Sequence, residues 1–189
     1  MSSPLDKLAN MLDQLKDHLP ISAGFIILLF GIQIINWILH YHLNRLGISP
    51  RKLVGLIGIP CSPFLHGDFS HLIFNLLPLF IFSNLILLQG ENTFFTVTTI
   101  IIFMSGLLIW LFARKGVHVG ASGLIMGYLG FILIGMYHKP SYLSIILGAA
   151  CVYYFAGMLS GLLPQQDKRV SWEAHLFGFI SGIIAAFLI

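Results

Sequence analysis

Six long stretches that are almost free of Asp, Glu, Lys and Arg limit most strongly what this chain can fold into. They are Ile21–Leu43, His71–Gln89, Thr93–Phe112, Val117–Tyr137, Ser141–Pro164 and Val170–Ile189, the last interrupted only by Glu173. Each can supply the roughly 20 residues that a helix needs to cross the hydrocarbon core of a bilayer. Backbone hydrogen bonds cannot be left open in lipid, so such stretches form helices. Only 9% of the residues are charged, against about 25% in typical soluble domains. We therefore predict an all-α membrane protein with six transmembrane helices.

The segments outside these stretches indicate how the chain is organised. Residues 1–20 mix charged residues with leucines at helical spacing, which predicts an amphipathic segment on the membrane surface; a tail or crystal-packing helix would fit almost as well. Residues 21–189 are predicted to form one six-helix core, because most connections between spans are short. The connection Asn44–Ser70 is longer. Its uncharged part, Leu53–Leu65, is too short to cross and is broken by glycine and proline, which predicts a half-buried first loop.

Polar side chains fall at the starts of three spans. His71 and Asn75 open the second span, Ser122 lies near the start of the fourth, and His175 lies near the start of the sixth. Polar groups inside a membrane are costly and by default indicate function. If the helices alternate in direction, spans two, four and six begin on the same face. We therefore expect these four side chains to meet.

A serine hydroxyl needs a neighbouring base to become a nucleophile, and His175 can be that base for Ser122. The Ser122 N–H at a helix N-terminus could stabilise an oxyanion. His71 and Asn75 are one helical turn apart, so both could add donors to the same oxyanion hole.

Small residues repeat every four positions in spans four and six. The positions are Gly123 and Gly127 in one span and Ala174, Gly178 and Gly182 in the other. This spacing lets two transmembrane helices approach closely. Generic packing would explain the pattern equally well.

Plainer interpretations account for several other polar residues. Glu173 lies two residues before His175 and points to nearly the opposite side of the helix, so we interpret it as an interfacial anchor. His118 lies near a span end, where its ring would suit the headgroup region. The HExxH pattern of zinc proteases is absent, and scattered basic residues give no nucleic-acid footprint. A small channel or transporter is disfavoured, because the polar groups cluster at one end.

Three motifs, in order along the chain, resemble those of the rhomboid intramembrane serine proteases. They are His71-Leu-Ile-Phe-Asn75, Gly120-Ala-Ser122-Gly123 and Ala174-His175-Leu-Phe-Gly178-Phe-Ile-Ser-Gly182. The segment Pro63-Phe-Leu-His66-Gly is similar to the end of that family's first loop. The resemblance implies a six-helix rhomboid-like bundle that cleaves transmembrane protein substrates in or near their spans. It implies no metal and no cofactor.

The resemblance also implies roles for single residues. Ser122 and His175 would form a catalytic dyad, and His71, Asn75 and the Ser122 N–H would form the oxyanion hole. Structural support would come from His66, Gly120, Gly123, Gly178, Gly182 and Met126, where Met126 occupies the place of an aromatic residue in many members. A catalytically inactive relative that binds transmembrane clients is the alternative.

The resemblance implies a bacterial inner membrane, a cytoplasmic N-terminus and an active site facing outward. Charge conflicts with that orientation, because it leaves Lys7, Lys16 and Lys139 inside and Arg45, Arg51, Lys52, Arg114, Lys115, Lys168 and Arg169 outside. Cytoplasmic loops normally carry the excess of basic residues. In either orientation, Ser122 lies on the side that is rich in Arg and Lys.

Overall fold

The computed structural model describes residues 4–138, 153 and 171–189. In this part of the chain the elements are α1 (Pro4–Ile38), η1 (His42–Leu46), η2 (Leu53–Leu56), α2 (Gly58–Cys61), η3 (Ser62–Phe64), α3 (Phe69–Leu87), α4 (Glu91–Phe112), α5 (Ser122–His138) and α7 (Trp172–Leu188). The extended pairing among the described residues is an isolated antiparallel bridge between Ile48 and His118. The predicted all-α class is confirmed.

Three of the described helices are long and apolar enough to cross a membrane: the Ala9–Ile38 part of α1, α3 and α4. They match the first three predicted spans. Helices α5 and α7 match the fourth and sixth and have 17 residues each, which is the short end of the range for a crossing. Apart from Tyr153, the predicted span Ser141–Pro164 lies outside the described residues.

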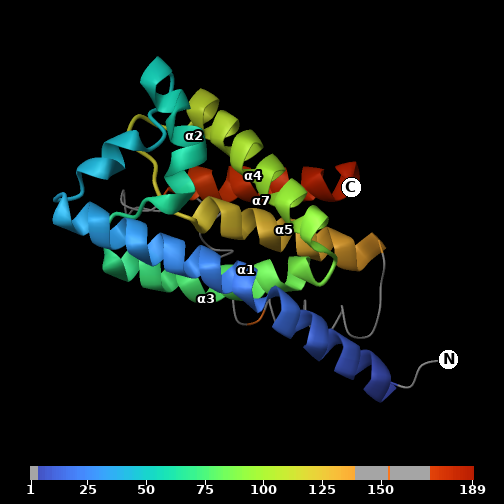
Figure 1. Ribbon diagram of the computed structural model, residues 1–189. Coiled ribbons are helices and arrows are strands. Elements are labelled where there is room, and N and C mark those ends of the chain that lie inside the picture. Colours follow the sequence, from blue (N-terminus) through green and yellow to red (C-terminus); the bar gives the residue numbers. More distant parts are fainter. Residues whose placement is uncertain (1–3, 139–152, 154–170) are drawn as a thin grey trace.

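Helix α1 joins the predicted surface segment to the first span. It runs from Pro4 to Ile38 and contains Pro20. Figure 1 shows a bend between its dark-blue N-terminal part and the lighter-blue remainder. A proline inside a helix removes a backbone hydrogen bond and kinks the helix, so Pro20 accounts for the bend. The division at residue 20 into a surface segment and a core stays a prediction.

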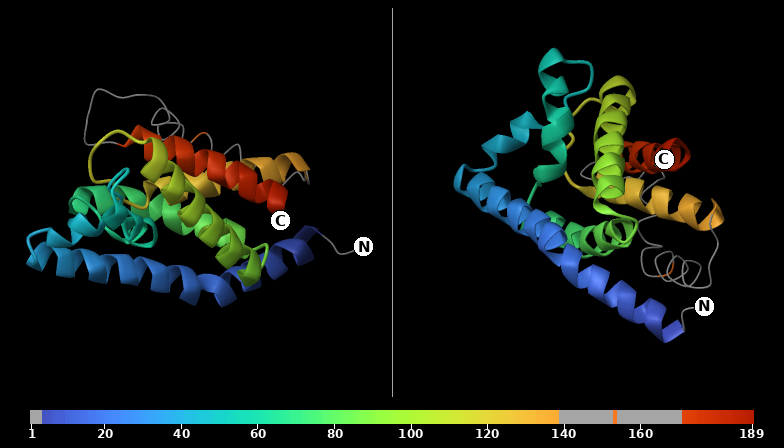
Figure 2. Two further views of the ribbon diagram at one scale, coloured as in Figure 1. Left: turned by 90° about the horizontal axis from the view of Figure 1, so that it is seen from above. Right: turned by 45° about the vertical axis from the view of Figure 1, so that its right-hand side comes forward.

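The direction of the helices follows the predicted alternation. Helices α3, α5 and α7 all begin on the left in Figure 1 and run to the right, whereas α1 ends on the left. The left-hand view in Figure 2 shows α7 running in the same direction as α5, and the two helices pack against each other. The starts of the second, fourth and sixth predicted spans therefore share one face of the bundle.

The connection between α1 and α3 is half-buried, as predicted. It folds into the short helical turns η1, η2, α2 and η3, because its glycines and prolines interrupt any longer helix. Leu53 is 82% exposed, whereas Ile59 and Leu65 are buried. A small cluster of buried apolar residues ties this loop to α4: Ile48, Ile59, Ile109 and Ala113.

A larger apolar cluster holds the helices together. It takes fully buried side chains from all five long helices, including Leu29, Phe82, Ile101, Met126 and Ala185. The most extensive contact among the described helices is between α5 and α7. The starts of these two helices carry Ser122 and His175.

Candidate active site

The connection Ala113–Ala121 fixes the position at which α5 begins. His118 and Ile48 exchange backbone hydrogen bonds of 2.9 and 3.0 Å. The Gly120 N–H then donates to the Ser62 carbonyl at 2.9 Å. Gly120 has a φ of +124°, a conformation that glycine adopts without the steric penalty of a side chain. The chain is thereby turned so that Ser122 becomes the first residue of α5.

Ser122 therefore lies where a helix has unsatisfied backbone donors. The first N–H groups of a helix have no partner within it, and the helix dipole places partial positive charge there. The Ser122 side chain is half-buried, so it remains accessible from one side. A negatively charged oxygen bound near this point would be stabilised.

His71 and Ser122 converge on Gly120. A Cβ atom built on Gly120 would lie 2.9 Å from His71 Nε2 and 3.8 Å from Ser122 Oγ. The His71 ring therefore lies against the Gly120 backbone, next to the serine hydroxyl. His71 sits in the first turn of α3, where its own N–H donates to the Asp68 carboxylate at 2.7 Å. The N-cap Asp68 fixes that turn and hence the ring.

Asn75 lies one turn deeper on α3 and is 4% exposed. Its Nδ2 is buried and has no hydrogen-bond partner among the described residues. Unpaired buried donors are costly, and in native structures they call for an explanation. A donor held ready for a ligand oxygen, on the same helix face as His71, is one such explanation.

His66 contacts the turn before Ser122. It is fully buried, and its Nε2 accepts the Ala121 N–H at 3.3 Å. Its ring also packs edge-on against the His71 ring, with 5.1 Å between the centroids. Burial is the main cause that lowers the pKa of His66 to about 3, with the His71 ring adding to it. The imidazole is therefore neutral at neutral pH and keeps the lone pair that Ala121 requires.

His175 is the fourth residue of α7, and its side chain is half-buried. Glycines allow this end of α7 to approach α5 closely. A Cβ on Gly123 would lie 3.1 Å from the Ala174 carbonyl oxygen, and a Cβ on Gly178 would overlap the Gly123 carbonyl. The residues next to Ser122 and His175 therefore touch across the two helices. The hydrogen bond between the two side chains stays a prediction.

The same close contact continues along the helices. A Cβ on Gly182 would overlap the Gly127 carbonyl, so the spacing of small residues marks a real helix interface. Met126 lies one turn after Ser122 and is fully buried in the apolar cluster. Its packing against the His175 ring stays a prediction.

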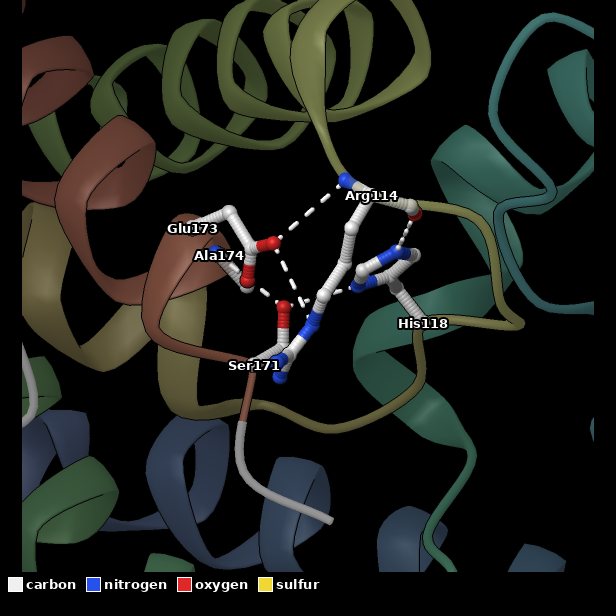
Figure 3. A network of polar contacts seen from close by, with 5 residues as sticks. All are labelled: Arg114, His118, Ser171, Glu173 and Ala174. Atoms are coloured by element: carbon white, nitrogen blue, oxygen red, sulfur yellow. Dashed lines mark hydrogen bonds and ion pairs between the residues drawn. The ribbon is translucent and has the colours of Figure 1, made fainter. Parts of the chain in front are cut away.

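A buried polar network at the start of α7 was not predicted (Figure 3). The Glu173 carboxylate accepts from Arg114 Nε at 3.3 Å and from the Arg114 N–H at 3.3 Å. Ser171 caps α7 by accepting the Ala174 N–H at 3.3 Å. The Ser171 hydroxyl and His118 Nδ1 are 2.7 Å apart, and His118 Nε2 donates to the Arg114 carbonyl at 3.1 Å.

Two interpretations made from the sequence are therefore wrong. Glu173 is 4% exposed and His118 is 7% exposed, so neither residue is an anchor in the headgroup region. The side of α7 opposite His175 packs against α4 and its following connection rather than facing lipid. Two features of the sequence could have indicated this network. Ser171 is a favoured N-cap residue before an apolar run, and basic residues at the end of another span could pair with Glu173.

No group of three or more His, Cys, Asp or Glu side chains suited to a metal ion occurs in the part of the chain that the structure describes. The chemistry that this site can offer is that of a hydroxyl, imidazoles, an amide and helix-terminal N–H groups.

Comparison with known proteins finds one matching family model and several similar proteins. The model of the Rhomboid domain matches residues 50–189. Uncharacterized proteins of Mycobacterium tuberculosis and Mycobacterium bovis are each 35% identical over 174 residues, which cover 87% of this chain and 72% of theirs. The RHOMBOID-like protein 4 of Arabidopsis thaliana is 28% identical over 155 residues, which cover 76% of this chain and 37% of its own. All the candidate site residues lie within the matched range.

Proposed function

Because this chain belongs to the rhomboid family, we propose that it is a serine endopeptidase of the membrane. Its substrates are other membrane proteins, which it cleaves in or near their transmembrane segments. One observation carries the proposal: Ser122 Oγ lies at a helix N-terminus beside the His71 imidazole, with both groups converging on Gly120.

The first half of the reaction needs a base and an oxyanion site. Ser122 Oγ attacks the carbonyl carbon of the scissile bond, and His175 takes the hydroxyl proton. The carbonyl oxygen becomes an oxyanion that the Ser122 N–H, His71 and Asn75 stabilise. His175 then gives the proton to the leaving amine, which departs and leaves an acyl group on Ser122. Losing one oxyanion donor typically lowers the rate about 10²–10³-fold.

The second half needs water. A water molecule loses a proton to His175 and attacks the acyl carbonyl; the proton returns to Ser122 Oγ as the acid product leaves. Ser122, His71 and His175 are all half-buried rather than enclosed, which is consistent with access to water from one side. A cavity open to water at membrane depth also accommodates backbone that is not helical, such as residues 113–121.

The support for His175 as the base is the close contact of α5 and α7. Gly123 and Gly178 allow the two helix starts to approach closely, and a proton transfer between their side chains requires such an approach. The Arg114–Glu173 pair and the Ser171 cap hold the turn of α7 that carries His175. We propose that these residues position the base without touching the substrate.

We also propose that the protein lies in a bacterial inner membrane with its active site facing outward. The bacterial relatives and the family resemblance support this orientation, whereas the distribution of Lys and Arg opposes it. Cysteine labelling of single-cysteine variants from each side of intact cells decides the question, because residues around Arg45 react from outside only if the orientation is correct.

Covalent labelling tests the nucleophile directly. The purified protein in detergent should react with a fluorophosphonate probe, which phosphonylates an activated serine and releases fluoride. Ser122→Ala and His175→Ala should abolish both labelling and cleavage of a transmembrane reporter. Ser181→Ala is the matched control, since the Ser181 hydroxyl is buried on α7 and donates to the Phe177 carbonyl at 2.7 Å; this variant should still be labelled.

The outcomes separate the candidate functions. Cleavage that survives in Ser122→Ala contradicts the nucleophile assignment. Labelling without cleavage of any reporter favours a specialised relative, and the absence of both in the wild-type protein favours the alternative of an inactive relative that binds transmembrane clients.

A further inference from the structure

A cluster of cations lies away from Ser122, between the first loop and the connection after α4. These two segments enclose an open cavity of about 390 Å³. Its lining includes Arg51, Lys52 and Lys115 and, among the described residues, no acidic side chain. Arg114 is adjacent in sequence but is paired with Glu173. Three cations around one open space, without an acidic neighbour in its lining, form a site for an anion.

The backbone that presents two of these cations is fixed. Ser49 to Lys52 form a turn closed by a hydrogen bond of 3.3 Å from the Lys52 N–H to the Ser49 carbonyl. Arg51 occupies the third position of the turn with a φ of +59°, where glycine or asparagine is normally favoured. Residues in such disfavoured conformations cluster at ligand clamps and other functional sites.

Contacts to the end of α4 hold this turn. The Arg51 N–H donates to the Trp110 carbonyl at 3.0 Å, and the Trp110 indole N–H donates to the Lys52 carbonyl at 2.8 Å. Arg51 Nη1 donates to the Leu111 carbonyl at 3.0 Å. The remaining guanidinium donors are left for a ligand, and the side chain is held beside the cavity before any ligand binds.

One exposed apolar residue lines the same cavity, and two more directly follow its lining in the sequence. Leu53 and Val54 directly follow Lys52 and are 82% and 61% exposed, and Val117, which lines the cavity, is 53% exposed. In a membrane protein, side chains like these face lipid, and adjacent Lys and Arg mark the headgroup level. A ligand that satisfies both surfaces has an anionic head and an apolar body.

We propose that this cavity binds the phosphate group of an anionic membrane lipid, with Arg51, Lys52 and Lys115 around the phosphate and the acyl chains along Leu53 and Val54. A free phosphate would use the cations but not the apolar border. The proposal also accounts for three of the seven basic residues in the charge conflict noted in the sequence, because binding to lipid phosphate favours these cations on this side in either orientation. It does not depend on peptide-bond hydrolysis.

Tryptophan quenching in nanodiscs tests the proposal on the full chain. The chain has three tryptophans, so the variant Trp37→Phe/Trp172→Phe leaves Trp110, which contacts the turn of Arg51 and Lys52. Phosphatidylglycerol with dibrominated acyl chains should quench Trp110 fluorescence in a saturable way, at lower mole fractions than phosphatidylcholine with the same chains. Lys52→Gln and Lys115→Gln should each weaken this preference about five-fold, the usual effect of one basic residue at an anionic surface.

Two further variants keep the test specific. Arg51→Gly removes the guanidinium and should weaken lipid binding; its effects on the melting temperature oppose each other, because the variant loses the bond to the Leu111 carbonyl but relieves the disfavoured backbone conformation. Arg45→Gln removes an exposed cation of η1 that does not line the cavity and should leave the preference unchanged. Equal quenching by the two lipids, or an equal loss in Arg45→Gln, would overturn the proposal. Release of the lipid by millimolar glycerol phosphate would show a site for soluble anions instead.

Discussion

Replacing Arg114 by methionine should slow the proposed protease more than replacing Glu173 by glutamine. The reason lies in the unequal burial of the two partners. The Glu173 side chain is 5% exposed, and its carboxylate oxygen Oε1 receives both bonds from Arg114, one from Nε and one from the backbone N–H. Its second oxygen, Oε2, is buried without a partner among the described residues. The Arg114 side chain is 37% exposed.

The magnitudes follow from that asymmetry. Arg114→Met leaves a buried carboxylate with a single backbone donor, and breaking a buried pair in this way costs about 3–5 kcal/mol. Glu173→Gln leaves an arginine that water can reach, so the loss should be close to that of a surface pair, about 1 kcal/mol. Both changes loosen the turn that carries His175. A displacement of about 1 Å at a catalytic group can cost about 10²-fold in rate.

The assay measures stability and catalysis separately. Thermal unfolding in detergent should rank wild type above Glu173→Gln and Glu173→Gln above Arg114→Met. Cleavage of a fluorogenic transmembrane reporter in liposomes should show kcat lowered about 10–100-fold in Arg114→Met with KM little changed, because neither residue contacts the substrate. Arg114→Lys, which keeps the charge, should recover most of the loss, and Arg45→Gln serves as a control for removal of a cation.

Two results would refute this reasoning. A Glu173→Gln protein less stable than Arg114→Met would mean that the carboxylate is not the buried partner that depends on the pair. A change confined to KM, with kcat preserved, would mean that the pair shapes substrate binding rather than the position of His175.

Two further predictions concern the helix interface and the turn before Ser122. Gly178→Ala should lower stability by about 1–3 kcal/mol by overpacking against the Gly123 carbonyl, whereas Gly135→Ala, which has open space around its Cβ, should not; equal melting temperatures would contradict this contact. The pKa of His66 is about 3 in the folded protein and about 6.5 when unfolded, so the unfolded state binds more protons between these values. Stability should therefore fall as the pH drops below about 6.5, by up to about 1.4 kcal/mol per pH unit; unfolding curves of His66→Gln should lose this component, and an unchanged slope would contradict it.

The sequence predicted the arrangement of the helices because that arrangement depends on simple constraints. Uncharged stretches must cross the bilayer, and alternation then puts the starts of α3, α5 and α7 on one face. Polar residues at those starts could be recognised because they are costly in lipid. His71 and Ser122 both lie within 4 Å of a Cβ built on Gly120, while the meeting of all four side chains stays a prediction. The half-buried first loop follows from glycines and prolines that no long helix tolerates.

The position of Glu173 could not be predicted in the same way. Helical periodicity places Glu173 and His175 on opposite sides of α7, but it does not say whether the far side faces lipid or protein. Here the far side meets Arg114, in a connection whose path is set by the bridge between His118 and Ile48. Such tertiary contacts depend on how a non-helical segment folds, and hydrophobic patterning carries little information about that.

The same connection holds both halves of the proposed dyad. Gly120 and Ala121 are tied to the first loop, which fixes the start of α5. Arg114 and His118 bind Glu173 and Ser171, which fixes the start of α7. In a serine–histidine pair without a third acidic residue, no carboxylate orients the imidazole directly. On the proposed mechanism, the helix on which the histidine sits sets the position of the imidazole. A single short segment therefore holds the two helix starts that carry the serine and the proposed base.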